Sequence, residues 1–164
     1  MKREDLQRVA GALEDPMRQF VRESRVRTAI LVNRSGQILA HHGFSRGLDV
    51  TNVAALSAAA HASAHALAQI TGAGHWMHLH HAGQEQQLFL APFALRGGDE
   101  LVMVAIFDQD STLGLVQLFF DRLTEAILAM PELGGKLPTG DVNAFEDDLG
   151  AGVERALSEN REER

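Results

Sequence analysis

The distribution of hydrophobic and polar positions is most unusual between Val50 and Gln84, where the chain has no Asp, Glu, Lys or Arg. The centre of this segment, VAALSAAAHASAHALAQI, predicts a helix without a charged face, whereas a surface helix normally keeps one polar side for water. At about 100° per residue, one side should lie on a sheet and carries Val53, Leu56, Ala60, Ala64 and Leu67. The opposite side is small and uncharged, and we expect another chain to cover it. It carries Ala55, Ala58, Ala62, His65 and Gln69, with Ala66 beside them.

The N-terminal part of the chain predicts a helix and a hairpin. Apolar residues recur at helical spacing over about Glu4 to Glu23, with Asp15-Pro16 restarting or kinking the helix midway. Two strand-like runs follow, TAILVN and QILAHHG, and Gly36 between them can supply the positive φ of a tight turn. The charge-free helix then begins at a cap formed by Asp49 or Thr51 and ends at Gly72.

Three more strand-like runs follow the charge-free helix: WMHLHHA, QQLFLAPFAL and ELVMVAIFD. Short turns at Gly83 and Arg96–Asp99 predict an antiparallel meander, and Pro92 should mark an edge or a bulge. The third run is apolar on both alternating faces, which predicts a central strand covered on one face by the first and last helices and on the other by the charge-free helix. The last helix starts after Asp110-Ser111-Thr112 and ends at Pro131.

The resulting order, α-ββ-α-βββ-α, predicts an α/β (α+β) fold in which helices sandwich a five-stranded antiparallel sheet. We expect residues 1–131 to form one domain and residues 132–164 to form a linker and an acidic, amphipathic C-terminal tail. If helical, this tail places Val142, Phe145 and Leu149 on one apolar side, and it is the second candidate surface for a partner. A frayed, solvated tail is the alternative.

Composition narrows the possible classes of function. The chain of 164 residues is 45% hydrophobic, has a formal net charge of -7 and contains no cysteine. An acidic chain is a poor binder of phosphate backbones, so nucleic acid is not an expected partner. Neither a signal peptide nor a segment long enough to span a membrane is apparent, and we expect a cytoplasmic protein.

Eight histidines are the only candidate metal ligands of note, and all lie between His41 and His81. The pair His61 and His65 has the i, i+4 spacing that zinc sites use on helices, and His78 and His80 should share one face of a strand with His81 on the other. However, no carboxylate occurs near them before Glu85. The favoured interpretation is that uncharged polar residues fill an interface, so no metal site is predicted.

Signatures of catalysis are missing. The chain has no phosphate-binding glycine loop, no nucleophile elbow and no cysteine nucleophile. The acidic residues Asp108 and Asp110 fit the start of a helix, and Glu146–Asp148 fits a solvated charge run. We therefore expect no active site and no cofactor, and a function exerted through protein contacts.

The predicted strands and helices include the segments ILVNRSGQILAHHG, LAQITG and LVMVAIFDQDSTLGLVQL. Together these segments resemble the Roadblock/dynein light chain family, and most closely the bacterial MglB proteins, which regulate the Ras-like GTPase MglA. The resemblance covers about Arg25 to Met130, and FDQDSTLGLV is its most specific part. It implies the Roadblock fold and an antiparallel homodimer in which the third strand and the second helix pair across a two-fold axis.

The resemblance also implies a function. The paired helices form a platform for a small Ras-like GTPase, and the regulator stimulates GTP hydrolysis without an arginine finger. By alignment, the contact positions fall on Ala58, Ala59, Ala62, His65, Ala66 and Gln69. The family often has Gly-Asn where this chain has Ala59-Ala60, and it often has an acidic, hydrophobic C-terminal segment that docks on the GTPase elsewhere. The alternative function is a scaffold or adaptor in a GTPase or sensor-kinase complex, because a fold does not determine an activity.

Overall fold

The computed structural model describes residues 3–134 and has the predicted order of elements. The helices are α1 (Arg3–Ser24), α2 (Val50–Thr71), α3 (Leu113–Leu128) and the short 3-10 helix η1 (Pro131–Leu133). The strands are β1 (Thr28–Asn33), β2 (Ile38–Gly43), β3 (Leu79–Ala82), β4 (Gln87–Ala94) and β5 (Glu100–Phe107). The α+β fold class predicted from the hydrophobic pattern is confirmed.

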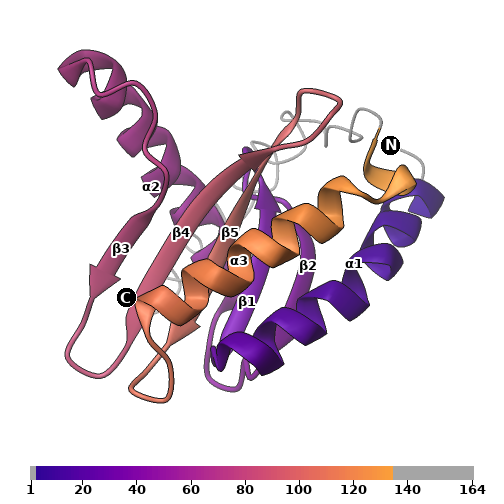
Figure 1. The fold of residues 1–164 in the computed structure, drawn as a ribbon, viewed down its shortest axis with the longest axis horizontal. Helices are drawn as coiled ribbons and strands as arrows, with labels where there is room; N and C mark the ends of the chain where they lie inside the picture. Colours follow the sequence, from indigo (N-terminus) through magenta and orange to yellow (C-terminus); the bar gives the residue numbers. More distant parts are fainter. Residues whose placement is uncertain (1–2, 135–164) are drawn as a thin grey trace, which may run out of the picture.

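The five strands form one antiparallel sheet in the order β2-β1-β5-β4-β3. The first hairpin therefore lies beside the end of the meander, and β5 is the central strand. Helices α1 and α3 cover one face of the sheet and α2 lies on the other (Figure 1). This is the arrangement that the two apolar faces of β5 predict.

The residues of β5 alternate between two hydrophobic clusters. Leu101, Met103 and Phe107 pack in the cluster under α1 and α3, whereas Val102 and Val104 pack in the cluster under α2. All five are fully buried. Burial of each large apolar side chain contributes about 1.5–3 kcal/mol to the stability of the fold. Strand β5 therefore stabilises the packing on both faces of the sheet.

The side of α2 that faces the sheet differs from the prediction. Val53 and Ala60 do pack on the sheet, but Leu56 and Leu67 are 70% and 53% exposed. The sheet is instead covered by the small residues Ala54, Ser57 and Ala58. The predicted orientation was therefore wrong for part of the helix, and Ala58, expected on the partner side, lies on the buried side.

Close packing explains this orientation. Gly36, in the β1–β2 turn with φ +82°, lies so near α2 that a Cβ atom there would be 3.2 Å from the Cα of Ala55. Only small side chains allow a helix to approach another backbone so closely, so they turn inward and the leucines turn outward. Because α2 has no charged side, its hydrophobic pattern does not clearly indicate which side of the helix faces the sheet.

Most predicted boundaries are confirmed. Asp49 caps α2 by accepting a hydrogen bond from the Asn52 N–H, and Gly72 ends the helix in the left-handed region. Pro92 lies beyond Leu90, where the pairing of β3 with β4 ends, and so occupies a sheet edge without a bulge. The third strand is shorter than predicted, because β3 begins at Leu79 and Trp76–His78 precede it as loop.

Candidate protein-binding surface

The outer side of α2 and the loop after it form the most apolar exposed surface in the described part of the chain. In Figure 1 the C-terminal half of α2 projects beyond the sheet, with the loop and β3 returning beside it. Five large hydrophobic side chains are exposed here: Leu56, Leu67, Ile70, Trp76 and Met77. We call these residues and the exposed small residues between them the α2 surface. Apolar exposure that is continuous along one element marks a binding surface.

The structure brings most of the predicted partner positions onto this surface. Ala59, Ala62, Ala66 and Gln69 are exposed, and His65 is partly exposed. Ala58 is 6% exposed and cannot contact a partner without a change in the fold. The tail residues Val142, Phe145 and Leu149 lie outside the described residues.

The sequence pattern missed several residues of the surface. The hydrophobic pattern places Leu56 and Leu67 on the sheet side of the helix, and Trp76 and Met77 in a strand. A signal for Ile70 was available, since this apolar residue stands in the last turn of a helix that has no charged side. Trp76 and Met77 follow Gly72 and Gly74, both with positive φ, and such glycines are typical of a loop rather than a strand.

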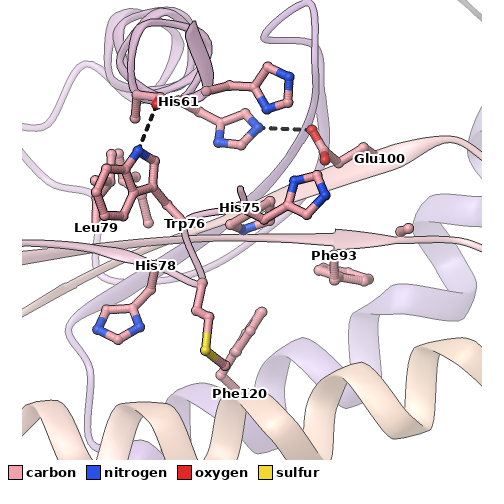
Figure 2. A pocket seen from close by; sticks show the side chains of 14 residues that line it. His61, His75, Trp76, His78, Leu79, Phe93, Glu100 and Phe120 are labelled. Atoms are coloured by element: carbon pink, nitrogen blue, oxygen red, sulfur yellow. Dashed lines mark hydrogen bonds and ion pairs between the residues drawn. The ribbon is translucent and has the colours of Figure 1, made fainter. Parts of the chain in front are cut away.

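Specific contacts hold this loop against α2. The Trp76 indole N–H donates to the Ala64 carbonyl oxygen at 2.8 Å (Figure 2). The imidazole rings of His65 and His75 stack with centroids 6.3 Å apart. The Ala73 N–H also donates to the Ala68 carbonyl, which completes the helix end. The loop is therefore placed by the helix and forms part of the same surface.

A pocket of about 430 Å³ lies between α2, this loop and the adjoining ends of β4 and β5. We call it the α2–β3 pocket. At one end His61 Nε2 lies 2.8 Å from Glu100 Oε1, and at the other end lie His78 and Phe120 (Figure 2). The pocket thus combines apolar and aromatic walls with a carboxylate and several imidazoles.

A second hollow, a groove of about 540 Å³, runs between α2 and the β3–β4 hairpin. Its walls include Val53, Leu56, Ala60 and Leu88, with His81 and Gln86 at the hairpin. Strand β3 is the last strand of the sheet and has a neighbour on one side only in the described chain. An open strand edge beside an apolar groove is a surface on which another chain can pack.

The histidines do not gather into a metal site within residues 3–134, where no three His, Asp or Glu side chains converge to hold an ion. His78 lies beside the Phe89 ring and His80 stacks on Phe107, which confirms that these two share one face, while His81 faces the groove on the other. His80 pairs with Gln87 at 2.8 Å, and His78 Nε2 lies 3.0 Å from Gln117 Nε2. These histidines thus contact amide side chains and aromatic rings.

Among the described helices, none has the length and hydrophobicity that crossing a bilayer requires.

The match to a family profile and the similarity to solved structures agree with each other. The sequence profile of the Roadblock/LC7 domain matches residues 13–107. Among solved structures, MglB of Myxococcus xanthus is similar with a TM-score of 0.64 and 24% identity, over 71% of this chain and 91% of that one. The gliding protein mglB of Thermus thermophilus is similar with a TM-score of 0.63 and 26% identity, over 73% of this chain and 87% of that one.

A third similar structure is an MglB with a tetrameric arrangement, with a TM-score of 0.60 and 27% identity, covering 78% of this chain and 90% of that one. A search of curated proteins finds no match.

Proposed function

The chain belongs to the Roadblock/LC7 domain family, and on this premise we propose that it is a cytoplasmic, homodimeric, MglB-like regulator of a small Ras-like GTPase of the MglA class. It accelerates GTP hydrolysis by binding the GTPase on the exposed small residues of the α2 surface, such as Ala62 and Ala66. The observation that carries this proposal is the exposed, uncharged side of α2. The similarity to MglB structures supports it.

The composition of the α2 surface supports a mechanism without an arginine finger. From Val50 to Gln84 the chain has no arginine or lysine that could reach into a nucleotide site. A regulator of this kind lowers the barrier by changing the conformation of the GTPase, so that residues of the GTPase itself stabilise the transition state. The regulator then needs a shaped contact surface and no catalytic group.

The test is a single-turnover assay of phosphate release from a purified MglA-type GTPase, with and without the full-length protein. We expect hydrolysis to accelerate by roughly tenfold or more, a modest effect beside the large accelerations known for GTPase activators. Binding without acceleration would make the protein a scaffold or adaptor. Absence of binding would refute the proposed function.

We also propose that the C-terminal segment assists the complex. Its residues Val142, Phe145 and Leu149 would contact the GTPase away from the α2 surface. Deletion of Gly140–Arg164 should leave the dimer and the acceleration of hydrolysis intact while weakening GTPase affinity and altering nucleotide exchange, as measured by release of a fluorescent nucleotide. Equal affinity and exchange rates for both proteins would contradict this role.

A further inference from the structure

We propose that the α2–β3 pocket receives the arginine side chain of the protein partner that covers the α2 surface. This inference rests on the proposed function for the existence of that partner. It adds the chemistry by which the partner is recognised, which the smooth and uncharged α2 surface cannot supply.

The charge of the pocket favours a cation. Glu100 is the one formally charged residue among the described residues that line it, and no lysine or arginine lines it. The Glu100 side chain is 30% exposed, so a ligand can reach it. Its contacts with His61 and Arg34 both use Oε1, which leaves Oε2 to accept hydrogen bonds from a ligand.

The apolar walls of the pocket suit the methylene stem of an arginine side chain. Trp76 and Pro92 are among the residues that line the pocket. An arginine side chain has an apolar stem of methylene groups that packs along such walls, while its planar head pairs with a carboxylate and stacks on aromatic rings. The imidazoles of His61, His65 and His75 add polar ring nitrogens to the walls of the pocket.

The position of the pocket indicates a protein source. Ala64 and His65 line the pocket and lie on α2 next to Ala62 and Ala66, which the α2 surface presents to a partner. Met77 also lines the pocket and is exposed. A partner on α2 therefore covers the mouth of the pocket, and one of its side chains can enter.

Arg34 of the same chain is a weak competitor for Glu100. Its Nε lies 3.8 Å from Glu100 Oε1, and it is mostly exposed. An exposed ion pair of this length contributes little, so it does not prevent a guanidinium group from binding at Oε2. Removal of Arg34 by Arg34→Ala should then tighten binding at the pocket.

The probe for the experiment is N-acetyl-arginine methylamide, and the neutral control is the corresponding citrulline derivative. Titrations of the full-length protein are followed by NMR through the Trp76 indole N–H and the backbone amide of Glu100. We expect saturable shifts with the arginine probe in the millimolar range and none with citrulline. Equal shifts with both probes, or none with arginine, would overturn the proposal.

Two matched variants distinguish a specific contribution of the Glu100 carboxylate from a general effect of losing one negative charge. Glu100→Gln should weaken binding of the probe and of the GTPase by roughly tenfold, because a charge pair is lost. Glu85→Gln removes the same charge from the exposed β3–β4 turn and should change neither affinity. A urea unfolding curve for each variant checks that the fold is kept.

The results distinguish this inference from the proposed function. If the GTPase binds Glu100→Gln as tightly as the unchanged protein, the pocket is not its recognition site, although the activity assay stands. If the GTPase does not bind at all, the proposed function fails. If both affinities fall with an unchanged unfolding midpoint, the pocket is the arginine site.

Discussion

Among single residues, Gly43 at the end of β2 has the tightest surroundings of the described glycines. Its φ is +106°, and a Cβ atom there would collide with the Arg27 carbonyl oxygen and lie 2.9 Å from the Thr28 Cα. Both obstacles are backbone atoms, at the start of β1 and just before it, which cannot move without breaking the hairpin register. The absence of a side chain at Gly43 is therefore a condition for the pairing of β1 with β2.

We expect Gly43→Ala to lower the free energy of unfolding by roughly 2–4 kcal/mol, from unfavourable φ and from the clash. Gly11→Ala is the matched control, because Gly11 lies in α1 with no atom within 4 Å of the new Cβ. That change should stabilise the protein by about 0.5–1 kcal/mol through helix propensity. Urea unfolding of both variants tests this, and similar stability of Gly43→Ala and the unchanged protein would contradict it.

His41 makes the stability of the protein depend on pH. Burial, with a smaller effect of the neighbouring His42, lowers the pKa of His41 below its ordinary 6.5. Its Nε2 atom is buried and has no hydrogen-bond partner in the described structure. A proton on Nε2 would therefore lie where the described residues provide no acceptor.

The unfolded chain takes up this proton at a higher pH than the folded chain, so the free energy of unfolding should fall as the pH drops below about 6.5. His41→Leu should reduce that fall, since it removes the titrating group and the unpaired nitrogen together. His81→Gln, at an exposed position, serves as the control and should keep the pH dependence. Identical pH profiles of the free energy of unfolding for His41→Leu and the unchanged protein would refute the assignment.

At the scale of elements, small residues of α2 have different tasks depending on whether their part of the helix is packed or exposed. Ala58 lies on the side packed against the β1–β2 turn, where a Cβ on Gly36 would be 3.6 Å from its own Cβ. Ala62 lies one turn further along and is exposed. The same substitution at these two positions therefore has different consequences.

Ala58→Arg should destabilise the fold by roughly 2–5 kcal/mol, because a charge and a long side chain enter a packed region. Ala62→Arg should change stability by no more than about 0.5 kcal/mol but weaken GTPase binding by about 2–5 kcal/mol, because the complex buries an unpaired charge. Unfolding curves and binding isotherms measure the two effects. Normal GTPase binding by Ala62→Arg and by Ala66→Arg would place the partner surface elsewhere.

At the scale of the whole molecule, the described domain has one face that a single copy does not cover. The exposed leucines of α2, the apolar groove and the open edge of β3 adjoin each other. The opposite face has α1 and α3 packed on the sheet (Figure 1). A second copy placed on the α2 side would extend the sheet and bury the leucines, as the family resemblance implies.

We expect sedimentation at micromolar concentration to give about twice the chain mass of 17.9 kDa. Leu67→Glu should shift the protein toward the monomer, because the charge would be buried at the contact. Leu118→Glu, on α3 and 48% exposed, introduces the same charge on the other face and should leave the mass unchanged. A monomer for the unchanged protein would contradict the proposed homodimer.

The sequence alone determined the order of the elements, most of their boundaries and the covering of β5 on both faces. These features depend on local signals, such as the alternation in LVMVAIF, the cap at Asp49 and the glycines at Gly36 and Gly72. It also revealed that α2 lacks a charged side, which is the basis of the proposed function. Such properties are visible in a short window of residues, and no distant contact changes them.

The tertiary structure alone decided which side of α2 meets the sheet, that Trp76 and Met77 belong to a loop, and that Glu100 lies beside His61. The first depends on how closely the β1–β2 turn approaches α2, and the second on a hydrogen bond from Trp76 to the helix carbonyl of Ala64. The third joins residues 39 positions apart in the chain. A helix that is apolar all round has no preferred direction of its own, so only the shapes of the neighbouring elements can set its orientation and the surface it exposes.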